Sequence, residues 1–149
     1  MAKFAYRMQS ILDIKIKLEN QAKIAYGIAN QKLAEEQEKL CEILARRAAY
    51  ENEAKELVSG TINVVKIREN KRAIDVIKSQ QRTQMMNVHI AEKNVEAARK
   101  HLNDVMTERK THERLKEKAF EEFVQELQYA ENKEIDELVS YSYHTEGIV

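Results

Sequence analysis

The pattern that predicts the fold of this chain is clearest between Leu33 and Leu57, where the sequence reads LAEEQEKLCEILARRAAYENEAKEL. Charged and polar residues occupy most positions, and the apolar ones recur at steps of three, four or seven. This spacing places the apolar side chains on one stripe of an α-helix, and a narrow stripe is typical of a helix that packs along another helix. The stripe residues here are Leu33, Leu40, Ile43, Tyr50, Ala54 and Leu57.

The stripe extends toward the N-terminus, and a second stripe follows it. The first one also includes Phe4, Met8, Ile11, Leu18, Ala22, Ala25 and Ala29. The second contains Ile67, Ile74, Ile77, Met85, Val88, Ala91, Val95, Ala98, Leu102, Val105, Leu115, Ala119, Phe123, Leu127 and Ala130, with polar interruptions at Asn70, Gln81, Arg109 and His112. Extra four-residue steps near Ala25 and Leu115 predict an uneven supercoil.

The chain has one break in its helical pattern, between Val58 and Asn63. Ser59 and Gly60 provide a left-handed stop, and Thr61 or Asn63 can cap a new helix. A connection this short requires antiparallel neighbours. We therefore predict an all-α fold, in which two long helices form an antiparallel coiled-coil hairpin.

We expect one domain, residues 1–149, and place its parts from the break and the two stripes. Helix 1 spans about 3–58, the turn about 59–63 and helix 2 about 64–139. Residues 140–149 lose the period and should fray. In this hairpin Leu57 should lie near Ile67, and Phe4 near Leu127 or Ala130.

Composition argues against several classes of protein. Charged residues make up 34% of the chain and aromatic residues 6%, too few large side chains for a globular interior. Lys and Arg number 25 and so do Asp and Glu, so the chain lacks the basic surplus that nucleic acid binding needs. No apolar run reaches the roughly 18 residues of a membrane span, and we expect a cytoplasmic protein.

Charge is uneven along the chain. Between residues 66 and 82 there are six basic residues and two acidic ones, whereas residues 131–149 hold five acidic residues and only Lys133 as a base. The beginning is basic as well, through Lys3, Arg7, Lys15 and Lys17. The beginning and the end of the chain therefore attract each other, which favours an antiparallel hairpin by a modest, salt-screened amount.

The sequence offers no set of catalytic residues, and we expect neither an enzyme nor a cofactor. Two helices form ridges and shallow grooves rather than an enclosed pocket, and three isolated glycines cannot make a phosphate-binding loop. A metal site is not expected, because no two of the histidines lie three or four residues apart on a helix. The histidines are His89, His101, His112 and His144.

A short second stripe runs beside the first one, through Gln37, Cys41, Leu44 and Ala48. Two interpretations are open. Its apolar groups are exposed and contact a partner, or the seam between the helices wanders between the two stripes. Cys41 has no histidine within a turn, which favours an apolar contact residue over a nucleophile.

Both ends of the chain carry segments that resemble the flagellar export protein FliJ family. Residues 4–15 read FAYRMQSILDIK. Toward the other end, ERK at 108–110 and LKEK at 115–118 lead to ENKEIDE at 131–137, which is similar to the closing pattern of the family. The resemblance covers nearly the whole chain in length, order and hairpin layout.

The resemblance implies a component of the flagellar type III protein export apparatus without activity of its own. Such a protein resembles the central stalk of rotary ATPases, sits in the ring of the export ATPase, promotes its assembly and couples it to the export gate. The implied partners are the export ATPase ring, the cytoplasmic domain of the membrane export gate and export chaperones. Contact with the membrane is peripheral, through the apparatus.

The resemblance also implies two partner-binding regions. The end that carries both termini would face the ATPase, through Phe4, Arg7, Met8, Ile11, Phe123 and Leu127. A stripe nearer the turn would face the gate, through Gln37, Cys41, Leu44 and Ala48 on the first helix and Asn70, Ile74, Ile77 and Gln81 on the second. Ala48 and Asn70 depart from the larger side chains that the family pattern implies.

Two other functions are compatible with the residues alone. A general export chaperone or adaptor would use exposed apolar groups of the hairpin to carry flagellar substrates. A structural coiled-coil module would dimerise through the same groups.

Overall fold

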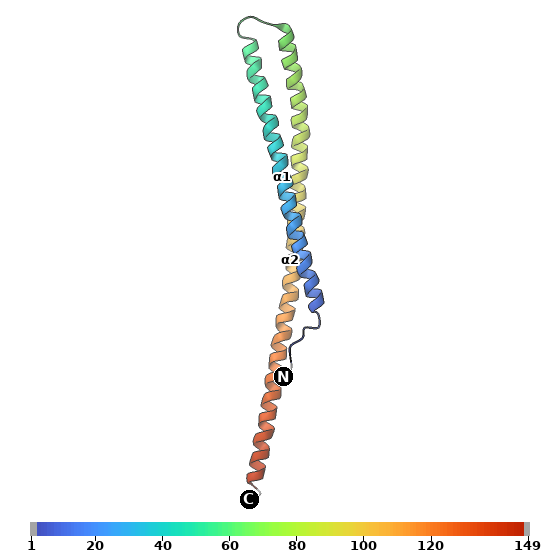
Figure 1. The fold of residues 1–149 in the computed structure, drawn as a ribbon, viewed down its shortest axis with the longest axis vertical. Helices are drawn as coiled ribbons and strands as arrows, with labels where there is room; N and C mark the ends of the chain where they lie inside the picture. The colour runs from blue at the N-terminus through green and yellow to red at the C-terminus, as the bar shows by residue number, and fades with distance from the viewer. Residues whose placement is uncertain (1–2, 148–149) are drawn as a thin grey trace. The chain divides into compact units, whose positions relative to one another are not determined.

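The structure is a computed structural model that describes residues 3–147 and consists of two helices, α1 (Gln9–Leu57) and α2 (Val64–Glu146). They contain 49 and 83 residues, and no strand occurs within the described range. The helices run antiparallel on either side of one turn (Figure 1). The prediction of an antiparallel coiled-coil hairpin is confirmed.

The first helix begins later than residue 3, so that part of the prediction is wrong. The N–H of Gln9 donates to the carbonyl of Tyr6 at 3.2 Å, and the first α-helical bond joins the N–H of Leu12 to the carbonyl of Met8 at 3.2 Å. Residues 3–6 are not helical, and Phe4 packs against α2 instead. The ring of Phe4 contacts α2 one heptad before Leu127 and Ala130, which were its expected neighbours.

The second helix ends later than residue 139, so the prediction of fraying from residue 140 is also wrong. Helix α2 continues to Glu146, and the N–H of Gly147 donates to the carbonyl of Tyr143 at 3.2 Å. Residues 124–146 contain neither proline nor glycine, so nothing in them ends a helix. Residues 148 and 149, also expected to fray, lie outside the described residues.

The turn follows the sequence signals. Gly60 has a positive φ of 95°, the left-handed conformation that a side chain would disfavour. The hydroxyl of Ser59 donates to the carbonyl of Glu56 at 2.9 Å. The side-chain oxygen of Asn63 accepts from the N–H groups of Val65 and Lys66 at 3.1 and 3.4 Å, so Asn63 is the N-cap of α2.

Tertiary contacts divide the chain into two units, and each contains segments of both helices. The terminal unit comprises residues 1–19 and 104–149, and the turn unit comprises residues 20–103.

In the turn unit the residues covered by the hairpin alternate in steps of three and four along both helices. This is a strict heptad pattern, so the expected extra four-residue step at Ala25 is absent: Ala25 is exposed and Tyr26 takes its place. The seam residues of α1 are Ala22, Tyr26, Ala29, Leu33, Glu36, Leu40, Ile43, Arg47, Tyr50, Ala54 and Leu57. Those of α2 are Ile67, Asn70, Ile74, Ile77, Gln81, Gln84, Val88, Ala91, Val95, Ala98 and Leu102.

The terminal unit follows the same rule. Leu115 is exposed while Lys116 is half-buried, so the extra step expected there is absent as well. The predicted stripe residue Leu18 is also exposed, and Glu19 is buried beside it. The seam consists of Leu12, Lys15 and Glu19 on α1 and Val105, Arg109, His112, Lys116, Ala119 and Phe123 on α2.

Polar residues on the seam of the turn unit pair across it. The Gln84 amide donates to the backbone carbonyl of Glu36 at 2.8 Å and to its carboxylate at 2.5 Å. The Asn70 amide donates to the carbonyl of Tyr50 at 3.0 Å. A shifted pairing of the helices would lose these bonds. It would therefore be less stable, because a buried polar group without a partner is costly. The polar pairs therefore select one register.

An ion pair has the same role in the terminal unit. The guanidinium of Arg109 donates to both carboxylate oxygens of Glu19, which is only 5% exposed, and also to Glu113 at 2.8 Å. Hydrogen bonds to Glu19 and then Glu113 raise the pKa of Arg109 above its ordinary value. Nearby, Lys15 pairs with Glu108 at 2.8 Å.

The side-chain carboxylate of Glu36 has three partners. The carboxylate lies 3.0 Å from the ammonium of Lys32 and 3.6 Å from that of Lys39, and it accepts the bond from Gln84. These contacts lower the pKa of Glu36, the hydrogen bond from Lys32 most and that from Gln84 next. The ionised form of Glu36 therefore stabilises the folded hairpin.

We predict that acid weakens the hairpin through Glu36. Because the folded-state pKa lies below the ordinary value of 4.5, the contribution is complete above about pH 4.5 and is lost as the pH falls through the folded-state pKa. Glu36→Gln should lower the melting temperature at pH 7, measured by circular dichroism. The difference from wild type should vanish in acid, where Glu36 is protonated.

Glu38→Gln is the matched control, since Glu38 is exposed on the same helix. It should melt like the wild type at pH 7. If Glu36→Gln also melts like the wild type, Glu36 does not stabilise the seam.

Candidate functional site

The first-helix half of the predicted gate-facing stripe lies on the surface. Gln37, Cys41, Leu44 and Ala48 are all exposed, and the side chain of Leu44 remains 43% accessible. The seam passes through their neighbours Glu36, Leu40, Ile43 and Arg47. The seam does not wander between the two stripes, so these four residues are open to a partner; whether they bind the gate stays a prediction.

The second-helix half lies on the seam instead. Ile77 is 4% exposed and Asn70 is 7% exposed, while Ile74 and Gln81 are half-buried. Gln81 also accepts a hydrogen bond from the guanidinium of Arg47 at 2.7 Å. The physical reason is that positions 70, 74, 77 and 81 continue the heptad steps of α2 and therefore face α1. The placement of Ile77 and Asn70 on a partner-facing surface is wrong.

The residues predicted to face the ATPase fall into two groups. Phe4 and Phe123 meet, with ring centroids 5.4 Å apart, and Ile11 is half-buried. Arg7, Met8 and Leu127 are exposed, Met8 to 44% and Leu127 to 37%.

Sequence reasoning missed Phe120. Its ring packs edge-on against Phe4, with centroids 5.1 Å apart and planes at 75°. Phe120 lies one turn before Phe123 on α2, and this spacing could have suggested a common contact. We refer to Phe4, Phe120 and Phe123 as the aromatic cluster.

Beyond the aromatic cluster α2 continues alone. Every residue from Gln125 to Thr145 is exposed, and Figure 1 shows no other element beside this part of the helix, drawn in red. We refer to residues 125–145 as the C-terminal segment. It carries large exposed apolar side chains, namely Leu127, Tyr129, Ile135, Leu138, Val139, Tyr141 and Tyr143.

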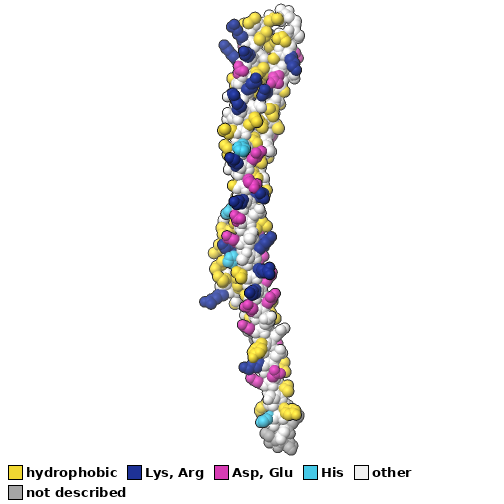
Figure 2. Space-filling view, turned by 180° about the vertical axis from the view of Figure 1, so that it is seen from behind, with side chains coloured by type: hydrophobic (Ala, Val, Ile, Leu, Met, Phe, Trp, Pro, Cys, Tyr) yellow, Lys and Arg dark blue, Asp and Glu magenta, His cyan; other side chains and the backbone are white. Residues whose placement is uncertain are grey.

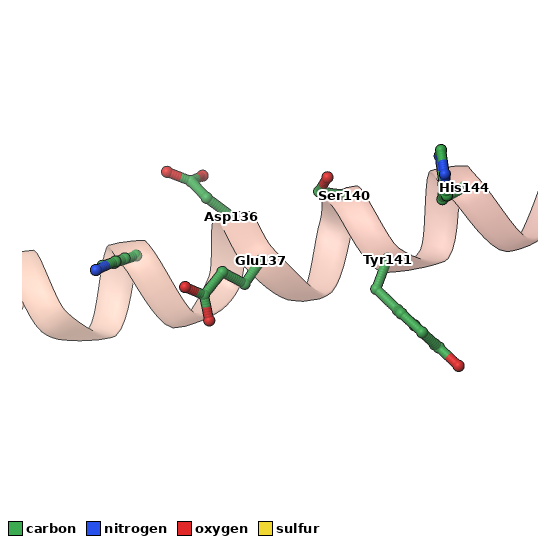
Figure 3. Close-up of a pocket in the computed structure, with 6 residues that line it drawn as sticks. Asp136, Glu137, Ser140, Tyr141 and His144 are labelled. Atoms are coloured by element: carbon green, nitrogen blue, oxygen red, sulfur yellow. The ribbon is translucent and has the colours of Figure 1, made fainter.

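The C-terminal segment does not form an enclosed pocket. A surface hollow along it is lined by residues of α2 only, among them Asp136, Ser140 and His144. Figure 3 shows these three side chains on one side of the helix and those of Glu137 and Tyr141 on the other. Without a second wall the hollow cannot exclude water from a small ligand.

A groove of about 280 Å³ lies between the helices next to the turn. Sequence reasoning did not predict it, although it confirms that Leu57 and Ile67 are neighbours, since both line it. Most of the residues that line it are apolar, and two of the charged ones are Lys71 and Lys78. We refer to it as the turn groove; its lining residues are Ala54, Leu57, Val58, Ile67, Asn70, Lys71, Ile74, Asp75 and Lys78.

Several ionisable groups of the described residues form ion pairs. The pKa of Glu96 is lowered, and that of Arg99 raised, by the hydrogen bond between them on the surface of α2. No group of three or more His, Cys, Asp or Glu residues in the described range is placed to hold a metal ion. One ring nitrogen of His112, Nδ1, is buried on the seam without a hydrogen-bond partner, and no sequence signal indicated this.

Within residues 3–147, neither helix includes an apolar stretch of the length that crossing a bilayer needs.

The fold places the chain in the class of antiparallel helical hairpins, and comparison with known proteins identifies its family. Residues 4–147 match the family described as Flagellar FliJ protein. The chain therefore belongs to the FliJ family and is a component of a type III protein export apparatus.

A solved structure has the same fold. It is CT670 from Chlamydia trachomatis, described as a candidate YscO homolog, and it is 24% identical to this chain. The similarity covers 95% of this chain and 96% of that one, with a TM-score of 0.58. No curated protein matches this sequence.

We predict that Ile77 and Leu44 respond differently to truncation. Ile77→Ala should lower the free energy of unfolding by about 2–4 kcal/mol, because it removes buried apolar volume from the seam. Leu44→Ala should change it much less, by under about 1 kcal/mol, because Leu44 lies outside the seam and is partly exposed. Urea denaturation measures both. Equal losses would mean that Leu44 also belongs to the seam.

Proposed function

We propose that this chain is a non-enzymatic stalk of the flagellar type III export apparatus. In this role it sits in the ring of the export ATPase, promotes assembly of the ring and couples it to the export gate. We place it in the cytoplasm at the inner face of the membrane. Membership of the FliJ family supports the apparatus, and the arrangement of the hairpin supports the stalk.

The observation that carries the proposal is the C-terminal segment. A helix with every side chain from Gln125 to Thr145 exposed can be surrounded on all sides, as the bore of a ring would require. Its apolar residues, such as Leu127 and Leu138, lack a partner within the described residues. Burying them in a ring gives the hydrophobic gain that favours insertion.

The aromatic cluster lies at the start of the C-terminal segment. Phe4 crosses from the beginning of the chain to Phe120 and Phe123 on α2. Met8 and Arg7 remain exposed beside it in sequence. Both ends of the chain can therefore contact the ring, as the resemblance to the family implies.

Ring assembly follows from preferential binding. If the stalk binds the assembled ring more tightly than free subunits, it shifts the subunits toward the ring by linkage. The exposed stripe of Gln37, Cys41, Leu44 and Ala48 would then contact the gate. Export chaperones are further partners of the proposed stalk.

An export chaperone or adaptor is the alternative that the exposed apolar residues favour. Such a protein would bind flagellar substrates in the absence of the ATPase, whereas a stalk needs the ATPase for its effect. A structural dimer is the third possibility.

The test measures ATP hydrolysis and hexamer formation by the cognate export ATPase, with and without this protein. The stalk should raise both when the ATPase is partly assembled. Leu127→Glu should reduce the stimulation at least tenfold, because it places a charge on the surface that enters the ring. Its helix content should be unchanged, since Leu127 lies outside the seam.

Leu44→Glu is the matched control, because it introduces the same charge at a similarly exposed leucine of the other region. It should leave ATPase stimulation unchanged and weaken binding to the cytoplasmic domain of the gate. If the wild type does not stimulate the ATPase but binds export substrates, the stalk function is wrong and the adaptor function is favoured.

A further inference from the structure

Two exposed surfaces of this chain are complementary to each other. Most of the residues that line the turn groove are apolar, and the charged ones include Lys71 and Lys78. The C-terminal segment presents apolar side chains together with carboxylates. We propose that the C-terminal segment of one molecule binds in the turn groove of a second copy, so that the protein associates with itself.

The apolar parts match in length. On the C-terminal segment Ile135, Leu138 and Tyr141 follow at three-residue steps, which places them on one face over about 9 Å. They are 55%, 63% and 75% exposed. In the groove, Ile67 and Ile74 are seven residues apart on α2, or about 10 Å. A helix laid along the groove would therefore cover all three side chains.

The charges at the edges are opposite. Glu134 precedes Leu138 by four residues and Glu137 precedes Tyr141 by four, so Glu134 lies on the apolar face at its N-terminal end and Glu137 lies beside that face. Lys71 and Lys78 border the groove, whose one carboxylate is Asp75. The surroundings reinforce the match, with six basic and two acidic residues in 66–82 against five acidic residues and one lysine in 131–149.

Figure 2 shows the same distribution of charged side chains on the face that it draws. Lys and Arg side chains gather near the turn, where apolar side chains lie between them. Along the last part of α2, apolar side chains alternate with Asp and Glu.

The occupant is a second molecule rather than the same one. The C-terminal segment and the α2 wall of the groove belong to one uninterrupted helix, Val64–Glu146, which cannot fold back on itself without breaking. The contact is small, so the association is reversible and concentration-dependent. It also weakens as salt rises, because its charged groups are exposed.

The groove includes Ile74, and the C-terminal segment is the proposed ring-binding surface. In each such contact the segment of one molecule is covered, so that molecule cannot insert its segment into a ring while it is bound to the second copy. The inference goes beyond the proposed stalk role and is tested on the purified chain alone.

The experiment is sedimentation velocity of the full-length protein over a concentration series at low salt. The wild type should sediment faster as its concentration rises. One variant reverses the groove, Lys71→Glu with Lys78→Glu, and another reverses the segment, Glu134→Lys with Glu137→Lys. In each variant alone the two surfaces repel, so the dissociation constant should rise at least tenfold.

The decisive sample is an equimolar mixture of the two variants. In the mixture every contact between unlike molecules joins opposite charges again, so association should return to the wild-type level. A wild type that stays monomeric, reversed variants that associate like the wild type, or a mixture that fails to associate would each overturn the proposal.

Two control variants distinguish the effect of where the reversed charges lie from the effect of the overall charge of the protein. Lys93→Glu with Lys100→Glu reverses two exposed lysines of α2 at the same seven-residue spacing, away from the groove. Glu35→Lys with Glu38→Lys does the same for two exposed glutamates at three-residue spacing. Both should associate like the wild type. Loss of association in the controls would attribute the effect to overall charge and overturn the groove as the site.

Leu138→Ser tests the apolar part. Circular dichroism should show an intact helix, because Leu138 has no partner in the hairpin. The dissociation constant should rise several-fold, and it should do so at high salt as well, where the charged contribution is screened. An unchanged constant would contradict docking of the apolar face.

Discussion

Strict heptad geometry is the constraint that shapes this protein. A seam with alternating steps of three and four residues requires a side chain at every heptad position, whether or not the sequence supplies an apolar one. Where it supplies a polar one, as at Glu36, a partner on the other helix stabilises the seam, because a buried unpaired polar group is costly. Gln84 is that partner, and Arg109 has the same relation to Glu19. Apolar burial holds the helices together, and these pairs specify how they align.

The regular seam also separates structural from functional surface. Ile77 lies inside it, so a change there alters stability first. Leu44 lies outside it and is available to a partner. The apolar surface that the seam leaves uncovered consists of the exposed stripe of α1, the turn groove and the C-terminal segment.

Part of this arrangement follows from local sequence signals alone. Spacing and family resemblance singled out Gln37, Cys41, Leu44 and Ala48, but left open whether they are exposed or part of the seam. The turn groove was not predicted, because it is formed by residues of both helices that are neighbours only after the chain folds back. The aromatic cluster was half predicted: Phe4 was expected on a helix, yet it lies before α1 and packs against Phe120 and Phe123.

The amino-acid sequence was sufficient for two helices, the stop at Gly60 and the cap at Asn63, because these depend on interactions within a few residues. It also specified that the helices pack along a stripe. Only the tertiary structure showed which of two adjacent stripes is covered, with Lys116 taking the place of Leu115 on the seam. The physical reason is that each heptad position is covered by the other helix, so geometry rather than the hydrophobicity of a single residue determines what is buried.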